Sequence, residues 1–124
     1  MEKKLILLVD DDNRNIFALT AVLKAKGYLV VSATSAREGL EILEQNKGIK
    51  VVLMDIMMPD MDGYEAVARI KSNAETASIP VIAVTAQAMM GDREKTLEAG
   101  ADEYISKPVD VDRLLELLHK YLAS

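Results

Sequence analysis

The 124-residue sequence predicts one α/β domain in which helices cover both faces of a parallel β-sheet. Apolar runs alternate with segments of helical periodicity from one end of the chain to the other. Most of these runs are continuous, which is typical of strands that are buried on both faces, as in parallel sheets. No linker, repeat or low-complexity stretch divides the chain, so we expect residues 1–124 to form a single domain.

The first predicted strand is the apolar run Leu5–Val9. A helix follows it, because apolar residues recur at helical spacing from Ile16 to Leu23 and Gly27 is placed to end that helix. The second predicted strand is the apolar run at residues 28–31. Strand, helix and strand in this order are typical of a parallel pair joined by a crossover helix.

Ser35 and Glu38 have the spacing of a capping box, which predicts the start of the second helix. The third predicted strand is the run Val-Val-Leu-Met at residues 51–54. It leads directly into Asp55, and a buried carboxylate without a partner is costly. The third helix is expected to begin near residues 62–63.

The fourth predicted strand covers residues 81–84, and the helix after it is expected to end at residues 99–100, an Ala-Gly pair. The fifth strand, residues 103–105, is short and more polar, as an edge strand should be. The last helix is expected to start near Asp110 and carries leucines at helical spacing: Leu114, Leu115, Leu118 and Leu122.

The composition argues against several classes of function. The net charge of −5 does not suit a sequence-independent nucleic-acid surface, which needs clustered Lys and Arg. The chain has no cysteine, which excludes disulfides and Cys-based zinc sites. No apolar run approaches the ~20 residues of a membrane span and no signal peptide precedes the first strand, so we expect a cytoplasmic protein.

Polar residues follow the predicted strands at the point where each strand ends. They are Asp10, Asp11 and Asp12 after the first strand, Asp55 after the third, Thr85 after the fourth, and Ser106, Lys107 and Pro108 after the fifth. In α/β sheets, ligands bind beyond the carboxyl ends of the strands. A single acid at such a position is more often a helix cap or a turn residue. That interpretation best fits four acids: Asp12, Asp60, Asp62 and Asp110.

The acids as a set do not fit that interpretation, because carboxylates that converge on one edge of a sheet repel each other. A hard cation relieves the repulsion, and an all-oxygen cluster without His or Cys suits Mg²⁺. A carboxylate beside Mg²⁺ can act as a nucleophile, while the metal and a lysine neutralise the oxygens of a transferring phosphoryl group. The strand ends therefore predict a metal-assisted phosphorylation site.

Four motifs resemble those of a known family, the receiver domain of two-component response regulators. They are "LLVDDD", "VLMDIMMPDMDG", "VIAVTA" and "YISKP", in that order, and the resemblance covers essentially the whole chain. It implies a doubly wound, flavodoxin-like sheet of five strands in the order 2-1-3-4-5 with five helices. It also implies that the Lys107–Pro108 peptide bond is cis.

The resemblance implies a role for each site residue. Asp55 is expected to accept a phosphoryl group from the phosphohistidine of a sensor kinase or a histidine phosphotransfer protein. Asp11 and Asp55 would bind Mg²⁺ directly, Asp10 mostly through water, and the backbone carbonyl of Met57 would complete the protein ligands. Lys107 would pair with the phosphoryl group.

The resemblance further implies a phosphorylation-dependent switch. Thr85 would move to hydrogen-bond the phosphoryl oxygens, and Tyr104 would swing into the space that Thr85 leaves. Ala86 is small and would leave the phosphoryl group room. The surface that changes would be the fourth helix, fifth strand and fifth helix, and it would bind a downstream output protein or domain, with no direct contact to nucleic acid or membrane.

Three alternatives stay open. The chain could be a pseudo-receiver that only binds a partner, although its acids, Thr85 and Lys107 are all present. It could be the receiver segment of a hybrid histidine kinase. It could be a phosphohydrolase with an Asp nucleophile, which is disfavoured because Met57, not an acid, lies two residues after Asp55. In the leading interpretation the chain is not a conventional enzyme and catalyses only its own Mg²⁺-dependent phosphorylation and dephosphorylation.

Overall fold

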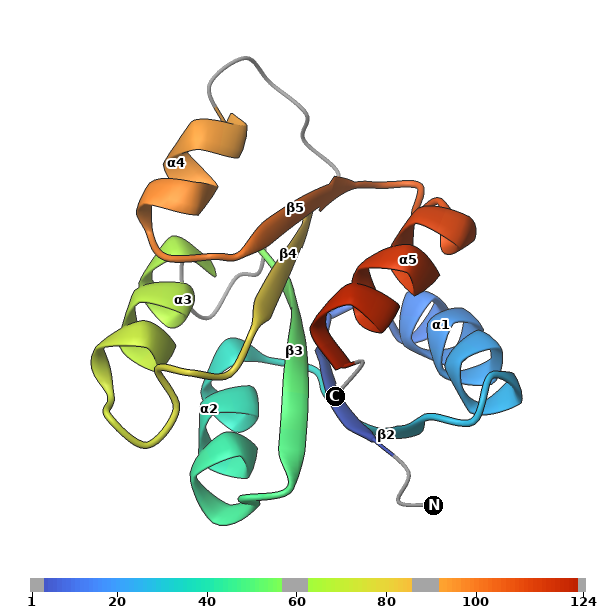
Figure 1. The fold of residues 1–124 in the computed structure, drawn as a ribbon, viewed down its shortest axis with the longest axis horizontal. Coiled ribbons are helices and arrows are strands. Elements are labelled where there is room, and N and C mark those ends of the chain that lie inside the picture. The colour runs from blue at the N-terminus through green and yellow to red at the C-terminus, as the bar shows by residue number, and fades with distance from the viewer. Residues whose placement is uncertain (1–3, 57–62, 86–91, 123–124) are drawn as a thin grey trace.

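The computed structural model describes residues 4–56, 63–85 and 92–122. Within these ranges, five strands and five helices alternate along the chain (Figure 1). The elements are β1 (Leu5–Val9), α1 (Asn13–Ala25), β2 (Leu29–Ala33), α2 (Ala36–Gln45), β3 (Ile49–Asp55), α3 (Gly63–Ser72), β4 (Val81–Thr85), α4 (Asp92–Glu98), β5 (Glu103–Ser106) and α5 (Val111–Leu122). None of these helices is both long enough and apolar enough to cross a membrane.

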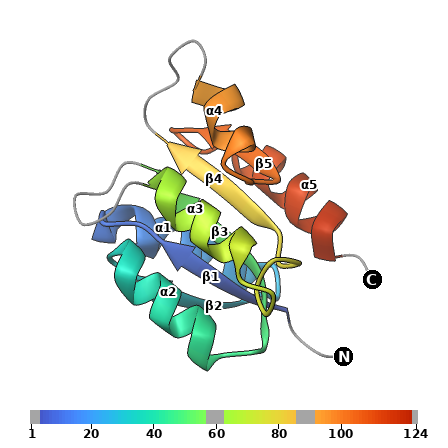
Figure 2. The same cartoon turned by 90° about the vertical axis from the view of Figure 1, so that its left-hand side faces the viewer.

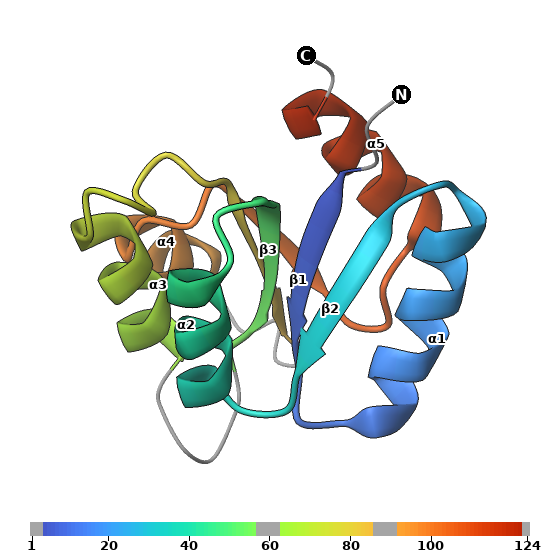
Figure 3. The same cartoon turned by 90° about the horizontal axis from the view of Figure 1, so that it is seen from below.

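The strands form one parallel sheet in the order β2-β1-β3-β4-β5, which confirms the predicted fold class and strand order. Helices α1 and α5 cover one face of the sheet, and α2, α3 and α4 lie on the other (Figures 1 and 3). Figure 2 shows α2 and α3 side by side over that second face. The order places β3 in the middle of the sheet, with β1 and β4 as its neighbours.

Two hydrophobic cores lie between the sheet and the two helix layers. Val52 and Met54 of β3 belong to the core beneath α2 and α3. Val51 and Leu53 belong to the core beneath α1 and α5. Successive side chains of a strand point to opposite faces, so a continuous apolar run fills both cores at once. This is why β3 reads as unbroken apolar sequence.

Four strands extend beyond the apolar runs that predicted them. β2 ends at Ala33, β3 at Asp55, β4 at Thr85 and β5 at Ser106. The backbone pairing continues past the last apolar side chain, since Asp55 pairs with Val84 and Thr85 pairs with Ser106. The polar residues predicted to follow β3 and β4 are therefore the last residues of these strands, and the sheet itself fixes where they lie.

Helix caps confirm several of the predicted boundaries. Gly27 has a positive φ of 92°, which suits the residue after the end of α1. At the start of α2, the Glu38 backbone N–H donates to the Ser35 hydroxyl at 3.1 Å. The Glu38 carboxylate in turn accepts from the Thr34 backbone N–H at 2.8 Å, one residue before the expected partner. Asp12 is the N-cap of α1, as its cap interpretation predicted.

The leucines at helical spacing in the last helix are not all buried. Leu114, Leu118 and Leu122 are buried. Leu115 is only partly buried, and Leu117 takes a buried position instead. The stripe on α5 therefore runs through Leu114, Leu117 and Leu118, a spacing of three and four residues that fits a helix packed on a sheet.

Gly63 allows the first residue of α3 to pack closely against the backbone just after β3. A Cβ atom at this position would lie 2.4 Å from the Ile56 Cα and 2.6 Å from its carbonyl oxygen. The Gly63 backbone N–H donates to that same carbonyl at 3.1 Å. Since Ile56 is the residue after Asp55, this close approach holds the end of β3 in place.

Candidate functional site

Three carboxylates converge at the carboxyl ends of β1 and β3. Asp10, Asp11 and Asp55 each offer an oxygen atom, and these oxygens lie within 4.8 Å of one another. The sheet explains the convergence, because β1 and β3 are neighbours and Val9 pairs with Met54. The residue after each member of that pair is Asp10 on one strand and Asp55 on the other. Asp10 is 1% exposed and Asp55 is 4% exposed, whereas Asp11 is exposed.

Asp10 is held by hydrogen bonds on both carboxylate oxygens. Its Oδ1 accepts from the Asp12 backbone N–H at 2.8 Å. Its Oδ2 accepts from Asn15 Nδ2 at 2.5 Å and from Lys107 Nζ at 3.1 Å. Asn15 was not among the predicted site residues. Its place in the first helical turn after the acidic cluster puts it near the acids, but its contact with Asp10 depends on how the chain enters α1.

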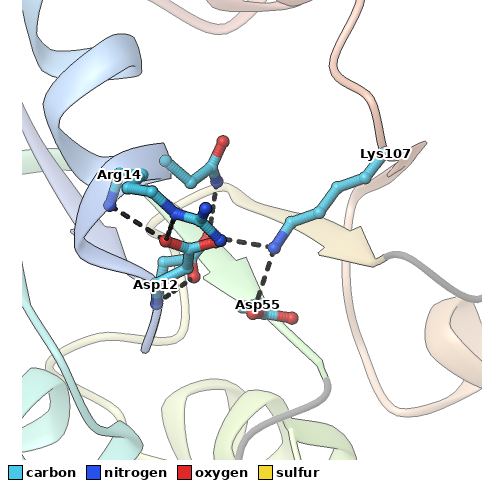
Figure 4. Close-up of polar contacts among 6 residues, drawn as sticks. Asp12, Arg14, Asp55 and Lys107 are labelled. Carbon is cyan, nitrogen blue, oxygen red and sulfur yellow. Dashed lines mark hydrogen bonds and ion pairs between the residues drawn. The ribbon is translucent and has the colours of Figure 1, made fainter.

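Lys107 bridges the two buried carboxylates, with Nζ 3.1 Å from Asp10 Oδ2 and 3.3 Å from Asp55 Oδ2. Figure 4 shows its side chain reaching across to Asp55. The Lys107 backbone N–H donates to the Thr85 carbonyl at 2.7 Å, which joins the segment after β5 to the end of β4. The Lys107–Pro108 peptide bond is cis, as the resemblance implied.

The Lys107 ammonium is protonated in this setting. Burial lowers the pKa of Lys107, but the hydrogen bond with Asp10 and the charge of Asp55 raise it by more, so its pKa lies above the ordinary value. One ammonium faces three carboxylates, which leaves these four groups with a net charge of −2. The lysine therefore balances only part of the repulsion among the acids.

The donor set fits a hard divalent cation. All three acids supply oxygen, and Asp11 makes no hydrogen bond or ion pair with any residue in the described ranges. A few carboxylates that leave room for water ligands suit Mg²⁺. The remaining negative charge attracts such an ion. Asp10, Asp11 and Asp55 are the residues that would hold it.

The predicted switch residues share one face of the sheet. Thr85 is 3% exposed and pairs with Ser106, while Tyr104 is partly buried and pairs with Ala83. Residues two apart on a strand point the same way, and paired residues on parallel strands do too. The Thr85 and Tyr104 side chains therefore project from the same face, two positions apart.

Met57 and Ala86, the other predicted ligand and switch positions, lie outside the described residues, as do Asp60 and Asp62.

Sequence comparisons place the chain among known signalling proteins. A family model described as the response regulator receiver domain matches residues 6–119. Protein PilH of Pseudomonas aeruginosa is 39% identical over 118 residues, which cover 95% of this chain and 97% of PilH. The polar-differentiation response regulator DivK of Brucella ovis is 36% identical over 119 residues, which cover 96% of each chain.

Solved structures agree with the sequence comparisons. The CheY-like response regulator receiver domain protein of Methanospirillum hungatei matches with a TM-score of 0.89 at 35% identity, covering 98% of this chain and 95% of that one. The receiver domain of a sensor histidine kinase from Pseudomonas aeruginosa has a magnesium ion coordinated in its active site cleft. It matches with a TM-score of 0.89 at 32% identity, covering 99% of this chain and 100% of that one. The resemblance seen in the four motifs is confirmed, and the chain belongs to the response regulator receiver domain family, which works in phosphorylation-based signalling.

Proposed function

We propose that Asp55 accepts a phosphoryl group from the phosphohistidine of a sensor kinase or a histidine phosphotransfer protein, in a reaction that requires Mg²⁺. The observation that carries this proposal is the position of the Asp55 carboxylate. It is buried, lies 3.3 Å from the Lys107 ammonium, and has two further carboxylates within 4.8 Å. A cation and an ammonium around one carboxylate are what an incoming phosphoryl group needs.

The sheet order favours Asp55 over Asp10 as the acceptor. Asp55 ends the middle strand β3, with the acids after β1 on one side and Thr85 of β4 on the other. A phosphoryl group on Asp55 would therefore lie between the cation-binding acids and the Thr85 hydroxyl. Asp10 follows β1, which is a strand further from β4 than Asp55 is.

The transfer needs few groups. An Asp55 carboxylate oxygen forms a bond to phosphorus, the bond between phosphorus and the donor histidine nitrogen breaks, and its electron pair stays on the imidazole. Mg²⁺, when bound, supplies positive charge to the phosphoryl oxygens. Lys107 donates a hydrogen bond to the same group of oxygens. Asp10 and Asp11, with the carbonyl of Met57, would complete the ligand set.

Phosphorylation would then change the α4–β5–α5 surface, which would bind the output protein or domain. The Thr85 hydroxyl would turn to the phosphoryl oxygens, and Tyr104, which projects from the same face of the sheet, would move toward the space it leaves. The Thr85 hydroxyl is buried and the Tyr104 ring is half-buried close to it. A new charge on Asp55 could therefore shift the equilibrium between two arrangements of these side chains. Ala86 would give the phosphoryl group room.

The donor would dock beside α1. This helix begins directly after the acids, and a donor must contact that edge of the molecule to bring its phosphohistidine to Asp55. A cavity of about 460 Å³ lies between α1 and β2, with Ile16, Phe17, Ala21 and Lys24 among its lining residues. Phe17 is 77% exposed. An exposed aromatic ring beside such a cavity would give a partner protein an apolar anchor, and aromatic residues are enriched at protein interfaces. A sensor-kinase partner would place the protein in the cytoplasm.

The test is transfer of a radiolabelled phosphoryl group from a phosphorylated histidine phosphotransfer protein to the parent and to Asp55→Asn. We expect Mg²⁺-dependent labelling of the parent and none of Asp55→Asn. A folded parent that stays unlabelled with every phosphohistidine donor supports the pseudo-receiver alternative. Continuous turnover of small phosphate esters would instead support the phosphohydrolase alternative.

A further inference from the structure

Asn15 lies in the first turn of α1 and contacts the site through its side-chain amide. Its Nδ2 donates to Asp10 Oδ2 at 2.5 Å, and the same oxygen accepts from Lys107 Nζ at 3.1 Å. A carboxylate can only accept hydrogen bonds, so the Asn15 atom that faces it is the amide nitrogen. One oxygen of Asp10 thus has two side-chain donors, one neutral and one charged.

The cap of α1 fixes the place of Asn15 independently of Lys107. The Asp12 carboxylate accepts from the Arg14 backbone N–H at 2.9 Å, and the Asp12 carbonyl accepts from Ile16 at 3.1 Å (Figure 4 shows the Asp12–Arg14 contacts). These bonds set the first helical turn, which carries Asn15. The backbone that carries the Asn15 amide is therefore held by bonds that do not involve Lys107.

In the proposed reaction, Lys107 binds the two buried carboxylates before transfer and the phosphoryl group after it. It pairs with Asp10 and Asp55 in this structure, and it must donate to the phosphoryl oxygens after transfer. When it turns to the phosphoryl group, Asp10 loses the one charged side-chain donor that it has among the described residues. Asp10 is 1% exposed, and a buried carboxylate that loses its donors is costly.

We infer that Asn15 is a positioning residue, whose amide keeps the Asp10 carboxylate in place when Lys107 turns to the phosphoryl group. This inference rests on the proposed function. The amide is neutral, so it holds the carboxylate without repelling a cation. A second lysine in its place would repel the cation. Groups that hydrogen-bond metal-ligating side chains usually change metal affinity by about 10- to 100-fold.

The first test measures Mg²⁺ affinity of the unphosphorylated protein by calorimetry. Asn15→Ala and the larger Asn15→Leu both remove the donor, and the second keeps the side-chain volume. We expect both to weaken Mg²⁺ binding about tenfold, and Asn15→Gln, which keeps an amide, to recover part of the loss. The matched control is Asn13→Ala, because the Asn13 side chain is exposed on the same helical turn and makes no hydrogen bond with the described residues. This control should stay within twofold of the parent.

The second test measures melting of the metal-free protein and combines Asn15→Ala with Lys107→Met. Asp10 Oδ2 keeps one side-chain donor in each single variant and none in the double variant. We therefore expect the double variant to lose more melting temperature than the two single variants together, whereas a merely structural role for Asn15 gives additive losses.

Two results would overturn the inference alone: Mg²⁺ binding within twofold of the parent in both Asn15→Ala and Asn15→Leu, or additive melting losses. A parent that takes no phosphoryl group on Asp55 would overturn the proposed function and the inference with it. A phosphorylated parent with unaffected Asn15 variants would overturn only the inference. The two failures are therefore distinguishable.

Discussion

The Lys107 ammonium lies 3.3 Å from the Asp55 carboxylate, although 52 positions separate the two residues in the chain. The contact exists because β3, β4 and β5 are neighbours in the sheet and all end at the same edge. It joins the proposed phosphoryl acceptor to the cation that would stabilise the transferred group.

Replacing Asp11 with Asn should stabilise the metal-free fold by on the order of 1 kcal/mol and weaken Mg²⁺ binding. Asp11 adds a third negative charge beside Asp10 and Asp55, and the single positive charge of Lys107 offsets only part of the three. Thermal melting in chelator and Mg²⁺ calorimetry measure the two effects. Glu41→Gln, an exposed acid on α2, is the control and should change neither. An Asp11→Asn variant that melts below the parent without metal would contradict the picture of mutually repelling acids.

Phe17→Ala should slow phosphoryl transfer from a histidine phosphotransfer protein by about tenfold, the loss of one exposed aromatic anchor at an interface. It should leave phosphorylation by acetyl phosphate unchanged, because a small donor needs no docking surface. Leu29→Ala on β2 is the control, since Leu29 is also an exposed large apolar residue, at 45% exposure. Equal slowing with both donors would show that Phe17 supports the structure of the site and does not contact the donor protein.

Gly63→Ala should destabilise the fold by about 2 to 3 kcal/mol, as overpacking does. The added Cβ would lie 2.4 Å from the Ile56 backbone, which cannot yield as a flexible side chain can. Chemical denaturation measures the loss. Gly48→Ala is the control, because its Cβ would meet only the Asn46 side chain, at 3.3 Å. A Gly63→Ala variant as stable as the parent would show that α3 does not pack on the end of β3 this closely.

Stability should fall between about pH 10 and pH 12 through Tyr121. Burial, the hydrogen bond to Glu103 and the negative charges of Glu103 and Asp102 together raise the pKa of Tyr121 to about 12. Below pH 10 the phenol keeps its proton in both the folded and the unfolded chain, so it adds no pH dependence there. Above pH 10 the unfolded chain releases the proton first, which favours unfolding until the folded state also releases it near pH 12.

Denaturant titrations of the parent and Tyr121→Phe from pH 8 to pH 11.5 measure this effect. The parent should lose more stability than Tyr121→Phe over the upper part of this range, while the two run parallel below pH 9.5. Parallel curves throughout would show that the Tyr121 phenol titrates alike in the folded and unfolded chains.

The strands and their polar ends could be predicted because one physical pattern marks both. A strand buried on two faces must be apolar throughout, so the first acid or hydroxyl marks its end, as Asp55 does for β3. The order of the strands came only from the family resemblance, since right-handed crossovers allow more than one order. The exact strand ends were short by a residue or more, because backbone pairing at Asp55 and Thr85 does not depend on side-chain polarity.

Asn15 and Gly63 could not be predicted as they stand in the structure. The contact of Asn15 with Asp10 depends on how the Asp12 cap turns the chain into α1, which no periodicity reports. The need for glycine at position 63 arises from the close approach of α3 to Ile56, which only the packed structure shows. Both are properties of tertiary geometry rather than of local sequence.

The central claim is that Asp55 is phosphorylated with the help of Mg²⁺. The most direct measurement is intact-mass spectrometry of the parent and Asp55→Ala after incubation with acetyl phosphate, with and without Mg²⁺. We predict a gain of one phosphoryl group that appears only in the parent and only with Mg²⁺. A folded parent that gains nothing, or an Asp55→Ala variant that gains as much as the parent, would contradict the claim.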